Sequence, residues 1–475
     1  MDYLKRIYES VVTKPQVFFA AFAGLFGILF LIAIPPLQTP DETTHFIRSY
    51  ALADFNLVSD KSGGEIGYYV EGSIASTIDL VDSNGEEYIK FNPSQKFDMG
   101  KTREASSIQL QGDTLFYETA SSASYISLVY APQALGIIIG KIFDTPVIGL
   151  LYLARLANLA AWIAIGYFAI KIMPVKKWAL VAILMLPMMI AQSVSLGTDV
   201  LSIGGGVLFV SLILRKIMTE SGSRVDNVLL ISSAVVMVVS KVVMAALLPL
   251  LLVLFFKNRK KRTVSTKTWG LVVTTVFAPL VFYFAWTAIM GMIVGAPDST
   301  PVNGESPTDQ LVFVLTEPWQ LPQAIFNTFF FTWGDGVIQS LIGNFGWVDT
   351  PIAGAFVVIG YIAIAFALFV NEPGETDKKK LTRGIRLLFL TCALIYFVGV
   401  CAAMYIYFTP AQFQIIVGIQ GRYFIPALVL LIPVLYGSYV LTSKRIYENV
   451  IKVTLIGLAC VSIVSILFRY YIVYL

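Results

Sequence analysis

A short polar cluster follows the first apolar segment and holds the residue types best suited to chemistry. Asp41 and Glu42 are followed by His45 and Arg48, and this histidine is the only one in the protein. A carboxylate beside a histidine and an arginine can serve as a general base, with neighbours that balance its charge. Apolar scaffolding has no need of such a group, so we expect the chemistry of the protein to lie here.

Helical phasing separates the two carboxylates if a helix begins at this point. Asp41, His45 and Arg48 are spaced i, i+4 and i+7 and share one helical face. Glu42 points about 100° away from that face. Thr39 as N-cap, with the following proline at the first helical position, would make Glu42 a capping-box residue with a structural role. Asp41 is therefore the stronger candidate for the general base. The alternative is that Asp41, His45 and Arg48 form only a ladder of ion pairs on the protein surface.

Four further charged residues stand within or beside apolar runs: Arg155, Asp199, Lys241 and Arg422. An arginine inside a membrane span costs several kcal/mol unless it is paired, and it indicates function by default. A structural ion pair between Arg155 and Asp199 is one alternative. For Lys241 and Arg422 the alternative is snorkelling of the charged group to the membrane interface.

The elements that must position these residues are membrane helices. The chain has 475 residues, of which 57% are hydrophobic and 13% are charged. A soluble protein of this length would carry about 25% charged residues. The three cysteines fall inside apolar runs, which argues against a disulfide framework and against a thiolate metal site. The composition predicts an all-α polytopic membrane protein.

Apolar runs long enough to cross a bilayer, which takes about 20 residues, predict eleven transmembrane helices. The first is too long for a typical cleaved signal peptide, so we expect it to be retained. The predicted spans are residues 16–36, 147–172, 177–194, 198–217, 226–240, 242–256, 268–293, 352–370, 385–408, 423–442 and 449–473.

Lysine and arginine clusters orient these helices, because basic loops stay on the cytoplasmic side. The clusters share one side only if residues 226–256 form a hairpin of two short helices with Lys241 at its turn. One long tilted helix is the alternative. The hairpin is favoured because residues 294–351, assigned to the outer face, contain no lysine or arginine. We therefore expect a multi-pass cell-membrane protein with a cytoplasmic amino terminus and an outer carboxyl terminus. The basic clusters are Lys5 to Lys14, Lys171 to Lys177, Arg215 to Arg224, Lys257 to Arg262, Lys378 to Arg386 and Lys444 with Arg445.

The predicted topology divides the chain into five parts. Residues 125–143 and 322–347 are expected to form interfacial helices on the outer side, with ordinary spans as the alternative. The parts are the first helix (1–36), an extracytoplasmic loop (37–146), helices two to seven (147–293), a second outer loop (294–351) and helices eight to eleven (352–475).

The first outer loop is expected to contain a small β insert. The β-prone runs Ile74–Val81 and Glu86–Phe91 flank Asn84 and Gly85. Asn-Gly between such runs is typical of a β-hairpin turn.

This topology gathers Asp41 and distant cations at the outer membrane face, which suits the binding of a lipid phosphate. Arginine grips phosphate oxygens in a bidentate manner, and lysine supplies a point charge. A phosphate leaves more easily when its developing charge is neutralised. Polyprenyl-phosphate-linked sugars present their reactive carbon at this depth. The residues expected at this face are Asp41, His45, Arg48, Asp199, Lys241 and Arg422.

The order of these motifs resembles that of GT-C membrane glycosyltransferases, which carry an acidic residue in the first outer loop. The chain is also similar, over most of its length, to a bacterial family of predicted membrane proteins of unknown function. Thr39 stands where that family usually has a second proline, and Thr198 replaces the commoner serine; neither change removes a charge. The matching motifs are Thr39-Pro40-Asp41-Glu42 to Arg48, Tyr130-Ala131-Pro132-Gln133 with Gly136, Ala154-Arg155 with Asn158, Gly197-Thr198-Asp199 and Gly418-Ile419-Gln420-Gly421-Arg422-Tyr423-Phe424-Ile425-Pro426.

The resemblance implies a GT-C-like fold and assigns roles to these residues. Asp41 would deprotonate the acceptor. Glu42 would either support Asp41 as its neighbour or bind, together with Asp41, a divalent metal such as Mg or Mn. Some GT-C enzymes use a metal and others do not, so metal dependence stays open. Arg422, Lys241 and Arg48 would bind the donor phosphate. Supporting roles would fall to His45, Tyr130, Arg155, Asp199, Gln420 and Tyr423.

The leading hypothesis is a glycosyltransferase that moves a sugar, by an inverting displacement, from a polyprenyl-phosphate donor to a cell-surface glycan, lipid or protein. A polysaccharide polymerase or ligase is a second hypothesis, but it would favour arginines in a later outer loop, which residues 294–351 lack. A flippase is the third, and it would place broken helices and charges near the bilayer midplane. We expect the protein to lie in a lipid bilayer, and we do not expect nucleic acid as a partner.

Overall fold

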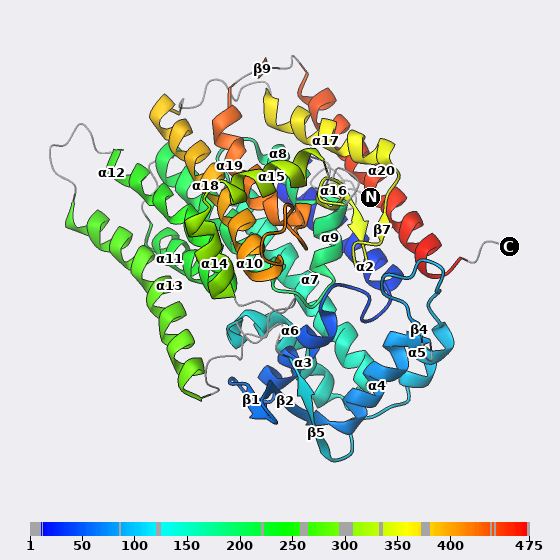
Figure 1. Ribbon diagram of the computed structural model, residues 1–475. Coiled ribbons are helices and arrows are strands. Elements are labelled where there is room, and N and C mark those ends of the chain that lie inside the picture. The colour runs from blue at the N-terminus through cyan, green and yellow to red at the C-terminus, as the bar shows by residue number, and fades with distance from the viewer. Residues whose placement is uncertain are drawn as a thin grey trace.

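Helices dominate the computed structural model (Figure 1), and the few strands are short. Six helices among the described residues are long and apolar enough to cross a membrane. The all-α membrane fold is confirmed at this level, whereas eleven spans and a GT-C fold stay predictions. The six are α2 (Pro15–Ala33), α7 (Val147–Ile172), α10 (Asp199–Met218), α13 (Thr266–Ile293), α18 (Arg383–Phe408) and α20 (Lys444–Tyr470). The structure describes residues 11, 13–84, 87–119, 125–219, 223–256, 265–293, 307–331, 336–371, 381–437, 439–440 and 443–472.

Several sequence predictions fall outside these described residues. They are the basic residues Lys5, Arg6, Lys257 to Arg262 and Lys378 to Lys380, the turn residue Gly85, and residues 294–306 and 332–335 of the second outer loop.

Helix α10 forms the centre of the bundle. Of its most apolar stretch, 83% is buried, against 6% for α13. It packs against α7 and against α11 (Arg224–Ser240), as well as against α19 (Ile425–Leu435) from the carboxyl-terminal part of the chain. The residue that opens α10, Asp199, is thereby fixed at one end of the most buried element.

Three of the predicted spans are broken or shorter in the structure. The single helix expected over 177–194 was wrong, because the chain forms α8 (Lys177–Leu184) and α9 (Pro187–Ser193). Proline lacks the amide that would continue the first helix, so a new helix starts at Pro187. The run 242–256 is a 3₁₀ helix, η3 (Val242–Leu252), followed by α12 (Val253–Phe256). The run 423–442 forms η5 (Gly421–Phe424) and then α19, which ends at Leu435.

The insert between the first two predicted spans contains a sheet, but not the one predicted. Residues 74–81 lie in helix α4 (Gly72–Asp82), so the strand expected there was wrong. Their buried side chains Ile74, Thr77, Ile78 and Val81 follow the i, i+3, i+4, i+7 spacing of a helix face. A two-residue ladder, β3 (Ser83–Asn84) with β4 (Glu87–Tyr88), does form at the predicted turn.

The main sheet of the insert is antiparallel in the order β1-β2-β5. Its strands are β1 (Asp60–Ser62), β2 (Glu65–Glu71) and β5 (Thr114–Glu118). In Figure 1 this blue-to-cyan insert lies at one end of the helix bundle, next to α3 (Glu42–Ala53) and α6 (Ala131–Ile142). The sheet contacts α3, so it helps to hold the helix that follows Asp41.

The expected interfacial helices correspond to shorter elements. Residues 125–143 hold η2 (Ser127–Tyr130) and α6, and α6 packs along α7. Residues 322–347 hold most of α15 (Gln320–Phe330), then α16 (Gln339–Ile342) and strand β6 (Asn344–Phe345). The other elements are α5 (Met99–Ala105), α14 (Pro307–Thr316), β7 (Thr350–Pro351), α17 (Gly354–Phe369), β8 (Val370–Asn371) and β9 (Tyr439–Val440).

Candidate functional site

Asp41 stands at the junction between the first membrane helix and α3. Its backbone is left-handed, with φ of 58°, and it is the N-cap of α3. Aspartate tolerates this conformation better than most residues. The predicted N-cap, Thr39, was therefore wrong by two positions. The Asp41 side chain is exposed and makes no capping hydrogen bond, so its carboxylate remains accessible at the helix entrance.

Glu42 is engaged in a buried ion pair with Arg155. The Arg155 Nε lies 2.8 Å from Glu42 Oε1, and its Nη2 lies 2.5 Å from Oε2. Both side chains are fully buried. The same guanidinium donates to the carbonyls of Ile34 and Pro35 at 2.9 Å each. The pairing of Arg155 with Asp199 considered from the sequence was wrong, and both Glu42 oxygens serve to anchor the start of α3 on α7.

Asp199 binds two cations that are distant in sequence. Its Oδ1 accepts a hydrogen bond from Lys241 Nζ, and its Oδ2 lies 3.3 Å from Arg422 Nε. The carboxylate opens α10, the lysine lies between α11 and η3, and the arginine belongs to η5. The Asp199 side chain is 7% exposed, and that of Lys241 is 23% exposed. One buried carboxylate thus holds a lysine and an arginine together with a net positive charge.

Two amide side chains hold the turn that precedes Asp199. Gln133 Nε2 donates to the carbonyls of Leu196 and Gly197, both at 3.2 Å, and Asn158 Nδ2 donates to the Ser195 carbonyl at 2.8 Å. They come from α6 and α7. These bonds give the glutamine and asparagine of the middle motifs a positioning role.

Glycines let the backbone approach closely at two of the motifs. A Cβ at Gly136 would lie 2.3 Å from the Leu153 carbonyl oxygen, where α6 crosses α7. A Cβ at Gly421 would lie 2.2 Å from the Val337 carbonyl oxygen. The Gly421 amide also donates to Ser340 Oγ at 2.7 Å. The residue before Arg422 is thereby locked against α16.

The residues flanking Arg422 differ in their contacts. The Tyr423 ring lies 5.1 Å from Lys241 Nζ and 5.4 Å from the Arg422 guanidinium. Its carbonyl accepts a hydrogen bond from Tyr396 Oη at 2.9 Å. Gln420 is the N-cap of η5 but its side chain does not cap the helix. Tyr423 therefore lies within the cation cluster, and Gln420 at its edge.

His45 and Arg48 are buried on α3. His45 Nδ1 lies 2.8 Å from Tyr130 Oη. Arg48 is 1% exposed and donates through Nη2 to the Tyr125 carbonyl. The Tyr68 and Tyr130 rings lie 5.7 and 5.5 Å from its guanidinium. Among the described residues, its Nε and Nη1 have no hydrogen-bond partner. A buried guanidinium with two unused donors indicates a place for an anion.

The protein environment shifts the pKa values of Asp41 and His45 in opposite directions. Burial lowers the pKa of His45 to about 3, which Asp199 opposes and Arg48 reinforces, so the imidazole is neutral at pH 7. Desolvation by neighbouring atoms raises the pKa of Asp41, whereas Arg422 and Lys90 pull it down. A raised pKa makes the Asp41 carboxylate a better proton acceptor near neutral pH.

Two residues in this environment were missed from the sequence. Tyr125 lies with its ring 6.0 Å from that of His45, and Lys241, Tyr423, Asp199 and Asp41 all influence the pKa of its hydroxyl, which burial raises. The positive charge of Lys90 lowers the pKa of the Asp41 carboxyl. Tyr125 lies in the predicted interfacial helix and Lys90 in a predicted strand, but nothing in either segment singled out these side chains as part of the site.

A family model matches the chain over most of its length. A model described as "Predicted membrane protein (DUF2142)" matches residues 22–431. The chain belongs to this DUF2142 family. The matched region includes every site residue from Asp41 to Arg422. No curated protein and no solved structure matches the chain.

The site of this DUF2142 protein is rich in positive charge. Its cations Arg48, Lys241 and Arg422 exceed its carboxylates Asp41 and Asp199 by one, with His45 neutral. Over the part of the chain that the structure describes, no three His, Cys, Asp or Glu side chains gather as metal ligands. Glu42, expected beside Asp41 as a ligand, is instead bound to Arg155. The arrangement suits an anion with an adjacent carboxylate base.

Proposed function

We propose that this protein is a membrane glycosyltransferase, which moves a sugar from a polyprenyl-phosphate donor to a glycan, lipid or protein acceptor. One observation carries the proposal. The exposed carboxylate of Asp41 adjoins a buried group of cations, and Arg48 within that group has two donors without a partner among the described residues. A phosphate would fill those donors and offset the net positive charge.

The reaction follows from these positions. The Asp41 carboxylate takes the proton of an acceptor hydroxyl, and the oxygen attacks the anomeric carbon of the sugar. The new C–O bond forms as the bond to the phosphate oxygen breaks, and polyprenyl phosphate leaves. Arg422, Lys241 and Arg48 stabilise the charge that develops on the leaving oxygen. A single displacement of this kind inverts the anomeric centre.

The proposed orientation places the site at the extracytoplasmic face and the amino terminus in the cytoplasm. Helix α10 carries Asp199 at its first residue and Arg215 with Lys216 in its last turn. Helix α7 likewise has Arg155 near its start and Lys171 in its last turn. The basic residues therefore sit at the ends opposite the site, as expected for cytoplasmic ends.

Turnover by purified protein in nanodiscs tests the proposal. Wild type, Asp41→Asn and Asp54→Asn would be incubated with a panel of polyprenyl-phosphate sugars, and released polyprenyl phosphate would be measured. Asp54 is the control, because it is an acid at the other end of α3, paired on the surface with Lys141. We expect turnover by wild type and Asp54→Asn and a loss of about 100-fold or more in Asp41→Asn. Equal turnover in all three would remove Asp41 from the mechanism. Release by none of them, with any donor, would refute the transferase.

A further inference from the structure

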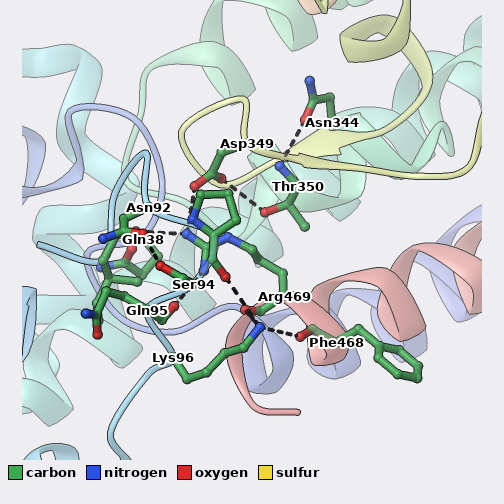
Figure 2. Close-up of polar contacts among 12 residues, drawn as sticks. Gln38, Asn92, Ser94, Gln95, Lys96, Asn344, Asp349, Thr350, Phe468 and Arg469 are labelled. Carbon is green, nitrogen blue, oxygen red and sulfur yellow. Dashed lines mark hydrogen bonds and ion pairs between the residues drawn. The ribbon is translucent and has the colours of Figure 1, made fainter. Parts of the chain in front are cut away.

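Arg469, at the end of α20, binds two outer segments together (Figure 2). Its Nη1 donates to the Gln95 carbonyl at 2.9 Å, and its Nη2 donates to the Ile89 carbonyl and to Asp349 Oδ2, both at 2.8 Å. Ile89 and Gln95 belong to the first outer loop, and Asp349 to the turn between β6 and β7. One guanidinium therefore fixes the distance between these two segments.

The first outer loop is also attached to the last turn of α20. Lys96 Nζ donates to the carbonyls of Phe468 and Arg469 at 3.1 and 3.0 Å (Figure 2), and the Phe97 amide donates to the Tyr470 carbonyl at 2.8 Å. A lysine on the last carbonyls of a helix satisfies acceptors that have no partner within the helix. The segment from Ile89 to Phe97 is thus anchored at several points.

The backbone at the tips of both segments is strained. Phe91 has φ of 58° and Val348 has φ of 66°. A β-branched residue such as Val348 rarely adopts this conformation. The neighbouring Gly346 has a φ of 60°, and a Cβ there would lie 2.3 Å from Tyr470 Oη, so a larger residue would have to displace that hydroxyl. Strain that surrounding contacts hold in place is a feature of binding and catalytic sites.

The strained tips present a compact group of two aromatic rings and a cation. The Phe91 ring meets that of Trp347 edge to face, with centroids 5.5 Å apart, and Lys90 Nζ lies 5.0 Å from the Trp347 ring. Phe91 is 65% exposed. Trp347 Nε1 is buried and has no hydrogen-bond partner among the described residues.

The hairpin that carries this aromatic group packs on the helix that precedes Asp41. Lys90 acts electrostatically on the Asp41 carboxylate. Phe345, in the same hairpin as Trp347, packs edge to face on Phe30 in the last turn of α2, with centroids 5.7 Å apart. The hairpin is therefore fixed to the helix whose end leads directly to Asp41.

We propose that Phe91, Trp347 and Lys90 form the acceptor subsite, which binds a pyranose ring. This inference rests on the proposed transferase function. The apolar C–H face of a pyranose packs on an exposed aromatic ring, while its equatorial hydroxyls meet polar groups at the ring edge. Lys90 supplies a donor there, and Asp41 accepts a proton from the hydroxyl that reacts. Simple anchoring of aromatics at the membrane requires neither the ammonium over the indole nor the strained tips.

Binding of soluble sugars tests the subsite without any donor. Full-length protein in nanodiscs would be titrated with fluorescently labelled tetrasaccharides of glucose, N-acetylglucosamine, mannose and galactose. Variants would be Trp347→Ala, Phe91→Asn and, as a matched control, Trp319→Ala. Asparagine tolerates the left-handed backbone of position 91, so Phe91→Asn removes the ring and preserves the turn. Trp319 is an 81% exposed tryptophan at the start of α15.

We expect wild type and Trp319→Ala to bind at least one tetrasaccharide with equal affinity, and Phe91→Asn and Trp347→Ala to bind it at least 10-fold more weakly. If Trp347→Ala does not give a monodisperse protein, the binding affinity of Phe91→Asn alone tests the subsite. Binding by Phe91→Asn equal to wild type, or no binding by wild type, would overturn the subsite. Binding that depends on Phe91 without turnover of any lipid donor would refute the transferase and leave the sugar site standing.

Discussion

The Asp199 carboxylate lies 3.3 Å from Arg422 Nε and also binds Lys241. This contact joins the start of the central helix α10 to the motif near the end of the chain. It keeps two cations close to each other, although they would otherwise repel. The proposed phosphate site depends on this arrangement, so changes to the cations should affect the donor more than the fold.

Arg422→Gln should lower kcat/KM for a polyprenyl-phosphate sugar by about 100-fold. One hydrogen bond to a developing oxyanion contributes about 10²–10³ in rate. Arg422→Lys should recover part of the activity, because it keeps the charge and loses the bidentate geometry. Lys444→Gln is the control, as Lys444 is an exposed lysine at the start of α20. Steady-state release of polyprenyl phosphate measures all three, and an unchanged kcat/KM in Arg422→Gln would exclude Arg422 from donor binding.

Breaking the buried pair of Glu42 with Arg155 should destabilise the protein strongly. Glu42→Gln leaves a fully buried guanidinium without its counter-charge, and removal of one partner of such a pair typically costs about 3–5 kcal/mol. Glu42→Gln combined with Arg155→Met should recover much of the loss. Unfolding in detergent measures this series. A Glu42→Gln variant as stable as wild type but inactive would instead give Glu42 a direct role in the reaction.

The pKa of His45 predicts how stability depends on pH. The pKa of His45 is about 3 in the folded protein, and its ordinary value is 6.5. Between pH 3 and 6.5 the unfolded chain therefore binds a proton at His45 that the folded chain does not bind. Stability from this residue is therefore full above pH 6.5 and falls as the pH drops toward 3, by about 1.4 kcal/mol per pH unit.

His45→Gln should lose this part of the acid sensitivity. Melting temperatures of both proteins between pH 4 and 8 measure the difference in slope. Parallel slopes would show that the imidazole titrates normally in the folded protein.

The pKa of Asp41 predicts the acid side of the rate profile. A general base acts only when deprotonated, so kcat/KM should fall as the pH drops through a value above that of an ordinary aspartate. Lys90 lowers this pKa, so Lys90→Gln should shift the acid limb to higher pH. A rate profile whose acid limb does not move in Lys90→Gln would contradict the electrostatic contact between the two residues.

The sequence predicted the membrane class, and it singled out charges that the structure brings together, because charges within apolar runs are conspicuous. Asp199, Lys241 and Arg422 were each noticed as charges near membrane helix ends, and the structure brings them into contact. The partner of Arg155 was not predicted: the sequence suggested Asp199, and only tertiary packing brings Glu42 to the guanidinium.

Local signals failed where tertiary structure decides the conformation. The run from Ile74 to Val81 is β-prone in composition but helical in its spacing, and packing of one buried face selected the helix. Lys90 and Trp347 lie in segments far apart in the sequence, which Arg469 holds together. No single-sequence pattern encodes a contact of that kind.

We propose Asp41 as the base of the reaction and not as a ligand of the donor. Donor binding and sugar transfer should therefore be measured on the same preparation of Asp41→Asn, with a polyprenyl-phosphate sugar that wild type turns over. The role of Asp41 as the base predicts a donor dissociation constant within about 2-fold of wild type and transfer at least 100-fold slower. Transfer at the wild-type rate would contradict it, and so would a loss of donor binding as large as the loss of transfer.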